Sequence, residues 1–443
     1  MKTEALAQAG DFVAMTTSSG LEVFVLPTRK FKTKLVRVQM RAQLSPRNAA
    51  RALVPNLLRR GTRRLPSMVD VSRTFEGLYG TSWSSAAYKL GDEQVLSFRL
   101  DAVEERFLPG RPALFEPALA LAHDLLFDPN LLEGRFPSGV FAQEKLNHLR
   151  EIDAQFNDKL TWAFQRLLDE TFPDEPYGRP VLGRRDEAES LGMDDAVAAW
   201  RELTTTLPAR VFAVGDFEPA RVVRFVEERL PLRAGTPRPV GAPAARARTG
   251  GAPPGPRLVV EREKISQSKL VTARMVDLAD LTEREFDALR VLAGVLGGGF
   301  HSRLFQSVRE KNSLAYYASA SLDRLRGVLY TSCGIDAADR ERVCDLVERE
   351  IASLASAPPR DDELDQTRRL IVSSGRSTFD SATGMVESFE AALAAGRVRS
   401  LDAVCRSVAA VTAADVQSAA QRVGPAQVVY CLEGEARHDD GGA

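Results

Sequence analysis

The sequence predicts an α+β fold made of two similar domains, and two observations carry that prediction. The stretch from Leu232 to Leu258 is dominated by Pro, Gly and Ala and has no apolar periodicity, so we interpret it as a linker. On either side of it, the predicted elements follow the same order: strand, helix, strand, strand, helix, helix. Many α+β chains share such an order, but a strand–turn–strand unit followed by paired helices on both sides favours a duplication. We therefore predict two homologous α/β-sandwich domains, each with a mainly antiparallel sheet and helices on one face.

The domain boundaries follow from the linker. We place the first domain at residues 1–232, the linker at 233–257, the second domain at 258–436 and a flexible tail at 437–443. The chain has 443 residues, of which 44% are hydrophobic and 27% charged, and this is enough for two separate cores.

The first half begins with a strand-like run from Lys34 to Leu44, followed by a Leu-rich helix and a second helix from Met68. The segment from Leu78 to Asp101 predicts two strands around a Gly-Asp turn. Two helices come next, at Leu114–Phe127 and Phe141–Phe156.

The second half repeats this pattern. A strand is predicted at Ser268–Leu278, and a helix follows with Thr282 and Glu285 placed as a capping box. A Gly turn divides the two strands predicted within Leu314–Asp336. Two helices complete the repeat, predicted at Arg340–Leu354 and Glu363–Phe379.

Composition excludes several classes of function. The net charge is −1, so no overall basic field favours nucleic acid. No run of about 18 apolar residues predicts a membrane span. The first residues lack the apolar region of a secretion signal, so we expect a cytoplasmic protein. Neither an HxxxH nor an HExxH pattern occurs. The four cysteines form no CxxC pair and are expected to be reduced structural thiols: Cys333, Cys344, Cys405 and Cys431.

Three motifs carry a resemblance to a known family. They are LGGGFHSRLFQSVREKNSLAYYASASLD at Leu296–Asp323, FPDEPYGRPVLGRRD at Phe172–Asp186 and RVFAVGDFEP at Arg210–Pro219. Together they resemble the insulinase-like (M16) zinc metallopeptidases, over nearly the whole chain. The resemblance implies that the two domains form half of a clamshell, and that two such halves enclose a chamber for peptides.

Active members of that family bind zinc through HxxEH on a helix of the first domain. Two histidines four positions apart share one helix face and converge on the ion, and the Glu takes a proton from the bound water. Here the three positions fall on Ala52, Pro55 and Asn56. Ala and Pro cannot bind zinc, and Asn is a poor ligand for it. Pro55 also removes a backbone donor, so we expect this helix to start late or to kink.

A later helix carries the family's distal glutamate. Glu144 and Glu151 lie seven positions apart, hence on one face, and match the distal Glu and a companion. Carboxylates without imidazoles will not hold zinc at useful affinity, so this chain is expected to bind no metal. We interpret both as surface residues of an ordinary amphipathic helix.

The motif of the second domain keeps its functional side chains. Active members place an Arg and a Tyr, seven positions apart, at the zinc site of the opposite half, and here these are Arg309 and Tyr316. The resemblance implies that the Arg binds a peptide carbonyl and that the Tyr hydroxyl stabilises the oxyanion. The alternative is an exposed helical Arg and a core aromatic. Tyr317 points to the opposite face of the strand and is the better candidate for the core.

A zinc-less first domain beside an intact Arg/Tyr motif resembles one subunit of the bacterial heterodimeric members. We therefore expect a non-zinc-binding subunit that hydrolyses peptides only with an HxxEH-bearing partner, which would hold the zinc. The peptide would add as a strand to the partner's sheet edge. Two other readings stay open: a structural or assembly subunit in which Arg309 and Tyr316 are relics, and a peptide-binding accessory protein. An autonomous peptidase is disfavoured, because no Ser/His/Asp or Cys/His constellation is visible.

Overall fold

The structure, a computed structural model, describes residues 5–235 and 256–434. It contains two compact units, and each is made of three chain segments. The N unit comprises residues 1–154, 179–239 and 378–400, and the C unit comprises 155–178, 240–377 and 401–443. Most of the predicted linker and all of the predicted tail lie outside the described residues.

The N unit is built on a seven-stranded sheet in the order β1-β2-β3-β7-β4-β6-β5. Every neighbouring pair is antiparallel except β3 and β7, which run parallel. The predicted first strand is β4, and the predicted strand pair is β5 and β6 around Gly91, whose φ is +57°. The strands are β1 (Ala5–Ala9), β2 (Phe12–Thr16), β3 (Glu22–Pro27), β4 (Thr33–Gln43), β5 (Ser82–Leu90), β6 (Glu93–Val103) and β7 (Ala209–Gly215).

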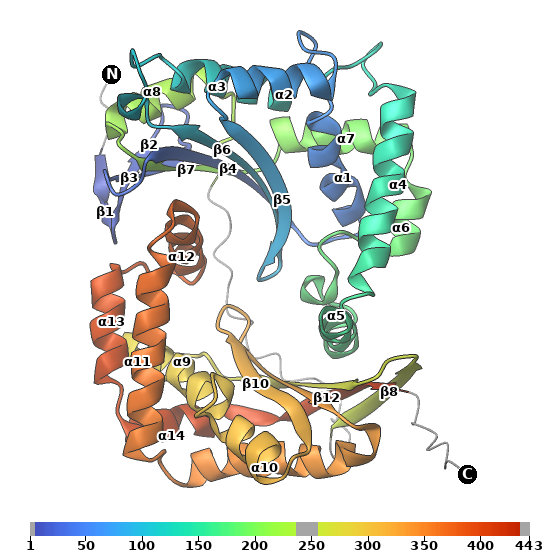
Figure 1. Cartoon of the computed structure of the whole chain (residues 1–443), viewed down its shortest axis with the longest axis vertical. Helices are drawn as coiled ribbons and strands as arrows, with labels where there is room; N and C mark the ends of the chain where they lie inside the picture. The colour runs from blue at the N-terminus through green and yellow to red at the C-terminus, as the bar shows by residue number, and fades with distance from the viewer. Residues whose placement is uncertain (1–4, 236–255, 435–443) are drawn as a thin grey trace. The chain divides into compact units, whose positions relative to one another are not determined.

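Helices cover both faces of this sheet. On β4, Val36, Val38 and Met40 face the main core of the N unit, whereas Leu35 alternates to the second face. That second face is covered by α12, which lies across the sheet from α3 and α8 (Figure 1). The helices are α1 (Asn48–Leu58), α2 (Met68–Gly77), α3 (Phe115–Phe127), α4 (Ser138–Gln155), α6 (Arg185–Ser190), α7 (Met193–Thr205), α8 (Pro219–Arg229) and α12 (Ala382–Ala394).

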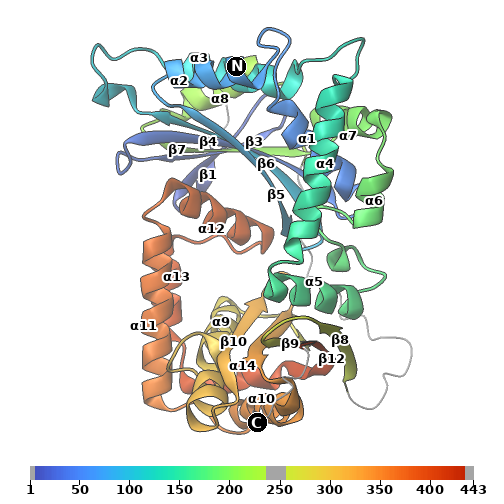
Figure 2. The same cartoon turned by 45° about the vertical axis from the view of Figure 1, so that its right-hand side comes forward.

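The C unit is built on a five-stranded sheet in the order β10-β11-β9-β12-β8, antiparallel except for β12 and β8. The strands are β8 (Arg257–Glu263), β9 (Ser268–Val276), β10 (Ala315–Asp323), β11 (Val328–Ile335) and β12 (Val423–Gly434). The helices are α5 (Lys159–Thr171), α9 (Glu283–Gly297), α10 (Arg340–Ser356), α11 (Asp361–Thr378), α13 (Leu401–Ala410) and α14 (Ala413–Gln421). Figure 2 shows α5 and α10 on opposite sides of this sheet.

The predicted α+β class, with two mainly antiparallel sheets and helices packed on them, is confirmed. The capping box of α9 is also present, because Thr282 accepts a hydrogen bond from the backbone of Glu285 and the Glu285 carboxylate accepts one in return. The prediction of helices on one face only is corrected, because α12 covers the second face of the N-unit sheet and α5 covers that of the C-unit sheet. Among the described residues, no helix has the length and apolar character needed to cross a membrane.

Candidate functional site

The degenerate zinc motif lies on α1, a buried helix of the N unit. Ala52 and Pro55 are buried and Asn56 is partly exposed, so this face offers no imidazole and no carboxylate. The expected late start of the helix is wrong: α1 begins seven residues before Pro55 and runs through it to Leu58. Packing against α7, β5 and β6 buries every residue of the helix except Asn56, and this burial outweighs the one backbone bond that Pro55 removes.

Glu144 on α4 is completely buried, which corrects the expectation of a surface residue. Its carboxylate pairs with the guanidinium of Arg60, just beyond the end of α1, and lies 3.8 Å from Nη2 of Arg59. Asn147 donates a third contact, at 3.4 Å. The ion pair with Arg60 is what makes burial of this carboxylate tolerable. Glu151 is exposed, as expected.

His148 lies one turn beyond Glu144 and is only 1% exposed. Its Nε2 lies 2.9 Å from the backbone oxygen of Leu182, so this nitrogen carries the hydrogen and donates it. Burial lowers the pKa of the imidazole, which is therefore neutral, and Nδ1 has no hydrogen-bond partner in the described part of the chain. His148 fixes α4 to the loop that precedes α6.

These residues do not fit a zinc ion. Ala52 and Pro55 have no donor atom, and the Glu144 carboxylate is already neutralised by Arg60. Across residues 5–235 and 256–434, no group of three or more His, Cys, Asp or Glu side chains could hold a metal. The side chains at α1 therefore cannot hold a zinc ion for catalysis.

Arg309 lies in the C unit on a π-helix, Phe305–Lys311, a geometry often found at functional sites. The side chain is exposed, and its guanidinium carbon lies 4.8 Å from the centre of the Phe305 ring. Its Nε is 3.7 Å from the Glu310 carboxylate, beyond hydrogen-bond distance. The aromatic ring therefore supports the guanidinium and leaves its donors free to bind a ligand.

Tyr316 lies on β10, the edge strand of the five-stranded sheet. Ala315 pairs with Ile335 and Tyr317 pairs with Gly334, so Tyr316 is the extra residue of a β-bulge. Tyr316 is 58% exposed, which excludes the reading of this residue as a core aromatic. A bulge re-aims one side chain away from the alternation of its strand, and bulges are frequent beside active sites. The π-helix packs beside β10, so both irregularities belong to one local assembly.

Tyr317 is the packed member of the tyrosine pair, as expected. Its ring lies over Gly334, where an added Cβ would come within 2.4 Å of Cε1. The hydroxyl is buried without a hydrogen-bond partner within the described residues, and burial raises its pKa.

Sequence reasoning found the motif positions but missed three features that shape them: the π-helix, the bulge and the Arg60–Glu144 pair. The pair had a signal, because a cluster of arginines directly follows α1 and Glu144 lies on a helix placed near it by the resemblance. The π-helix and the bulge had none, because the shift in apolar periodicity caused by one extra residue cannot be recognised over so short a segment.

A family model described as Peptidase M16 inactive domain matches residues 194–371. The probable inactive metalloprotease YmfF of Bacillus subtilis is 27% identical over 416 residues, 94% of this chain and 96% of that protein. An uncharacterized zinc protease of Mycobacterium tuberculosis is 30% identical over 317 residues, 69% of each chain. The crystal structure of a conserved protein from Enterococcus faecalis matches with a TM-score of 0.85 at 26% identity, covering 96% of this chain and 100% of that one. By these similarities the chain belongs to the M16 peptidase family.

Proposed function

We propose that this chain is the zinc-less subunit of a heterodimeric M16 peptidase and supplies Arg309 and Tyr316 to the zinc site of an HxxEH-bearing partner. The observation that carries the proposal is a contrast between the two candidate sites. The position of the zinc motif is closed by apolar packing and by the Arg60–Glu144 pair. Arg309 and Tyr316, by comparison, are exposed on two irregular backbone features.

The two side chains suit the hydrolysis of a peptide bond. The guanidinium of Arg309 donates hydrogen bonds to a backbone carbonyl and holds the peptide in position. The hydroxyl of Tyr316 donates a hydrogen bond to the carbonyl oxygen as negative charge builds on it, and such a donor is worth roughly 3 kcal/mol in the transition state. The partner's zinc would supply the activated water. The substrate class is unfolded peptide, bound as an added strand along the partner's sheet edge.

The alternative is a catalytically inactive structural or peptide-binding protein. The inactive type of the matching family model and the name of the Bacillus relative favour it. It predicts that the chain works without an HxxEH-bearing partner and that Arg309 and Tyr316 can be replaced at no cost to its role.

A tagged chain purified from its own organism, with mass spectrometry of the bound proteins, separates the two readings. The proposal expects a chain of similar size bearing HxxEH in equal amount. Mixing the two purified chains should then give peptidase activity that neither has alone. Recovery of the chain by itself or as a homodimer, or a mixture that cleaves nothing, supports the alternative.

A further inference from the structure

Two helices, α5 and α12, pack on a sheet whose strands all come from the other side of the linker in the sequence. The segment 155–178, which contains α5, precedes the linker but belongs to the C unit. The segment 378–400, which contains α12, follows the linker but belongs to the N unit. Each part of the chain, before and after the linker, therefore covers the second face of the sheet that the other part builds.

The apolar side of α5 is deeply buried in the C unit. Ala163 and Leu167 are both 0% exposed and share one core cluster with Val271 of β9 and Tyr430 of β12. The Phe164 ring meets the ring of Tyr330 edge to face, with centroids 5.8 Å apart. With the partly buried Leu160 and Leu168, these residues form one continuous apolar side of the helix, which packs on the sheet.

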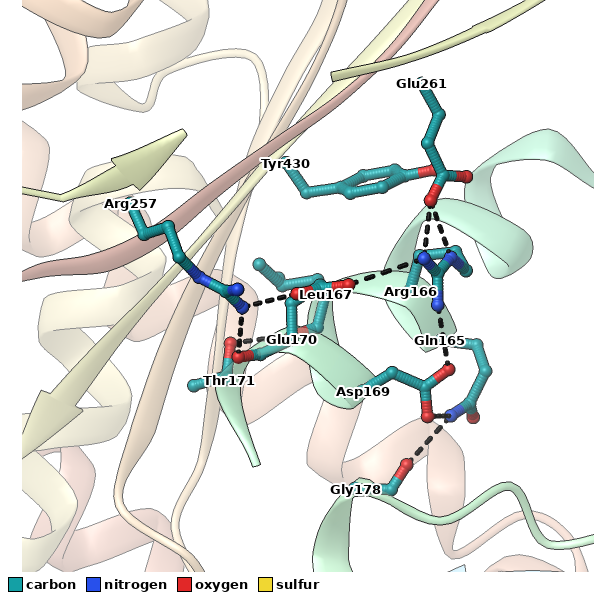
Figure 3. A network of polar contacts seen from close by, with 10 residues as sticks. All are labelled: Gln165, Arg166, Leu167, Asp169, Glu170, Thr171, Gly178, Arg257, Glu261 and Tyr430. Carbon is teal, nitrogen blue, oxygen red and sulfur yellow. Dashed lines mark hydrogen bonds and ion pairs between the residues drawn. The ribbon is translucent and has the colours of Figure 1, made fainter. Parts of the chain in front are cut away.

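Charged contacts fix the same helix to the edge of the sheet (Figure 3). Nε of Arg166 donates to the Glu261 carboxylate at 2.8 Å, and that carboxylate also accepts from the Tyr430 hydroxyl at 2.8 Å. One turn further on, the backbone oxygen of Glu170 accepts from Arg257 at 2.7 Å. Glu261 and Arg257 both belong to β8, so α5 is bonded to the strand that directly follows the linker.

The end of the segment is held separately. The hydroxyl of Tyr177 donates to the Asp323 carboxylate at 2.5 Å and lies 2.9 Å from the hydroxyl of Tyr330. Tyr177 is 3% exposed, and Asp323 ends β10. The segment is therefore anchored on both sheet edges, at β8 through α5 and at β10 through Tyr177.

In the N unit, α12 is anchored in a comparable way. The Phe389 ring stacks on Phe12 with centroids 4.2 Å apart and meets Phe24 at 5.1 Å. The buried carboxylate of Glu390 accepts from the Tyr88 hydroxyl at 2.6 Å. An aromatic core and a buried hydrogen bond thus hold α12 on strands that precede the linker.

We propose that the parts of the chain before and after the linker are mutual binding partners, which stay together as a stable 1:1 complex when the linker is cut. The complex has two docking surfaces, one for α5 and one for α12. Contact at one docking surface keeps the two sides of the other at high effective concentration. The two parts of the chain therefore separate only when both surfaces are weakened. The linker joins the two parts but is not what keeps them associated. This inference is independent of the proposed function.

The test starts from the folded full-length chain with a protease site inserted after Thr249. After complete cleavage, size-exclusion chromatography over a dilution series should give one peak at the elution volume of the uncut chain, with both fragments in equal amount. Separation of the fragments on dilution to micromolar concentration, or aggregation on cleavage, would overturn the proposal.

Substitutions locate the association. Leu167→Ala weakens the α5 site and Phe389→Ala the α12 site, while Leu146→Ala, on the exposed side of α4, is the matched control. Each single variant should still elute as one cut complex at micromolar concentration, and the double variant should dissociate at a concentration at least tenfold higher than the wild type. Circular dichroism before cleavage checks that each variant is folded. A folded double variant that dissociates at the wild-type concentration would overturn the assignment to α5 and α12.

Discussion

The guanidinium of Arg60 is paired with the fully buried carboxylate of Glu144, and this pair joins the end of α1 to α4. The buried acid is neutralised by a cation of the same chain, so its burial needs no metal ion.

Removing the Arg60 side chain should therefore destabilise the folded chain. Arg60→Ala leaves a buried carboxylate with only the distant Arg59 as a countercharge, and we expect a loss of roughly 3 kcal/mol in the free energy of unfolding. The double variant Arg60→Met, Glu144→Leu should recover most of it, because no buried charge remains. Urea denaturation measures both. Arg63→Ala, which breaks an exposed pair with Asp128, is the control and should cost less than about 1 kcal/mol. Equal losses for Arg60→Ala and Arg63→Ala would contradict this account.

The purified chain should hold much less than one zinc per molecule and should cleave no peptide by itself. The positions Ala52, Pro55 and Asn56 supply no strong ligand, and Arg60 competes for the one buried carboxylate nearby. Elemental analysis after dialysis against a weak chelator measures the metal content. One tightly held zinc per chain would refute our reading of α1.

The two tyrosines of β10 provide a matched pair of variants. If the chain forms the proposed heterodimer, Tyr316→Phe and Arg309→Ala should each lower kcat/KM of the reconstituted pair about 100-fold, because on the proposed roles each removes a hydrogen-bond donor to the substrate. Tyr317→Phe removes a buried hydroxyl without a partner in the described residues, so activity should stay at the wild-type level. Glu310→Ala is the matching control for Arg309→Ala and should also keep wild-type activity. If Tyr316→Phe and Tyr317→Phe behave alike, the proposed donor role fails.

His148 should make the N unit less stable in acid. Its folded pKa lies below the ordinary value of 6.5 because burial disfavours the charged ring. The unfolded chain therefore binds the proton more readily, and stability that is present above pH 6.5 is lost as the pH falls through the folded pKa. The melting temperature of the wild type should fall more steeply between pH 7 and 5 than that of His148→Gln. Parallel curves for the two proteins would show that another group dominates.

Two glycines should respond to alanine in opposite directions. Gly297 ends α9 against β10, where an added Cβ would come within 2.1 Å of the Ala320 backbone nitrogen. Gly297→Ala should therefore destabilise by about 1–3 kcal/mol. A Cβ added at Gly375, inside α11, would have its nearest neighbour at 3.7 Å, which is ordinary van der Waals contact. Gly375→Ala should therefore stabilise the fold by up to about 1 kcal/mol. Thermal unfolding of both variants tests the contrast, and destabilisation by Gly375→Ala would show that α11 is packed more tightly than this distance implies.

Local patterns in the sequence predicted the regular parts of this fold. The apolar alternation of β4, the Gly91 turn and the Thr282 cap all act within a few residues, so periodicity and turn chemistry were enough. The burial of Glu144 depends on Arg60, which lies 84 positions away, and no local rule reports such a partner. The same holds for α5 and α12, whose apolar faces are visible in the sequence but whose sheets are not.

The motif residues were located by resemblance, and strand alternation indicated that Tyr317 rather than Tyr316 packs into the fold. The bulge could not be predicted in this way. It appears only in the pairing of β10 with β11, which shows that Tyr316 is the extra residue.

A π-turn takes in one residue more than an α-turn. Deleting a single residue within 305–311 would allow the segment to close as an ordinary α-helix, with about 100° of rotation per residue. Arg309 would then be turned to another side of the helix, although every side chain of the motif would still be present. The number of residues between Phe305 and Tyr316 is thus as much a determinant of this site as their chemistry. Homologues with a one-residue gap in this segment should be expected to aim the arginine elsewhere, even where an alignment pairs it with Arg309.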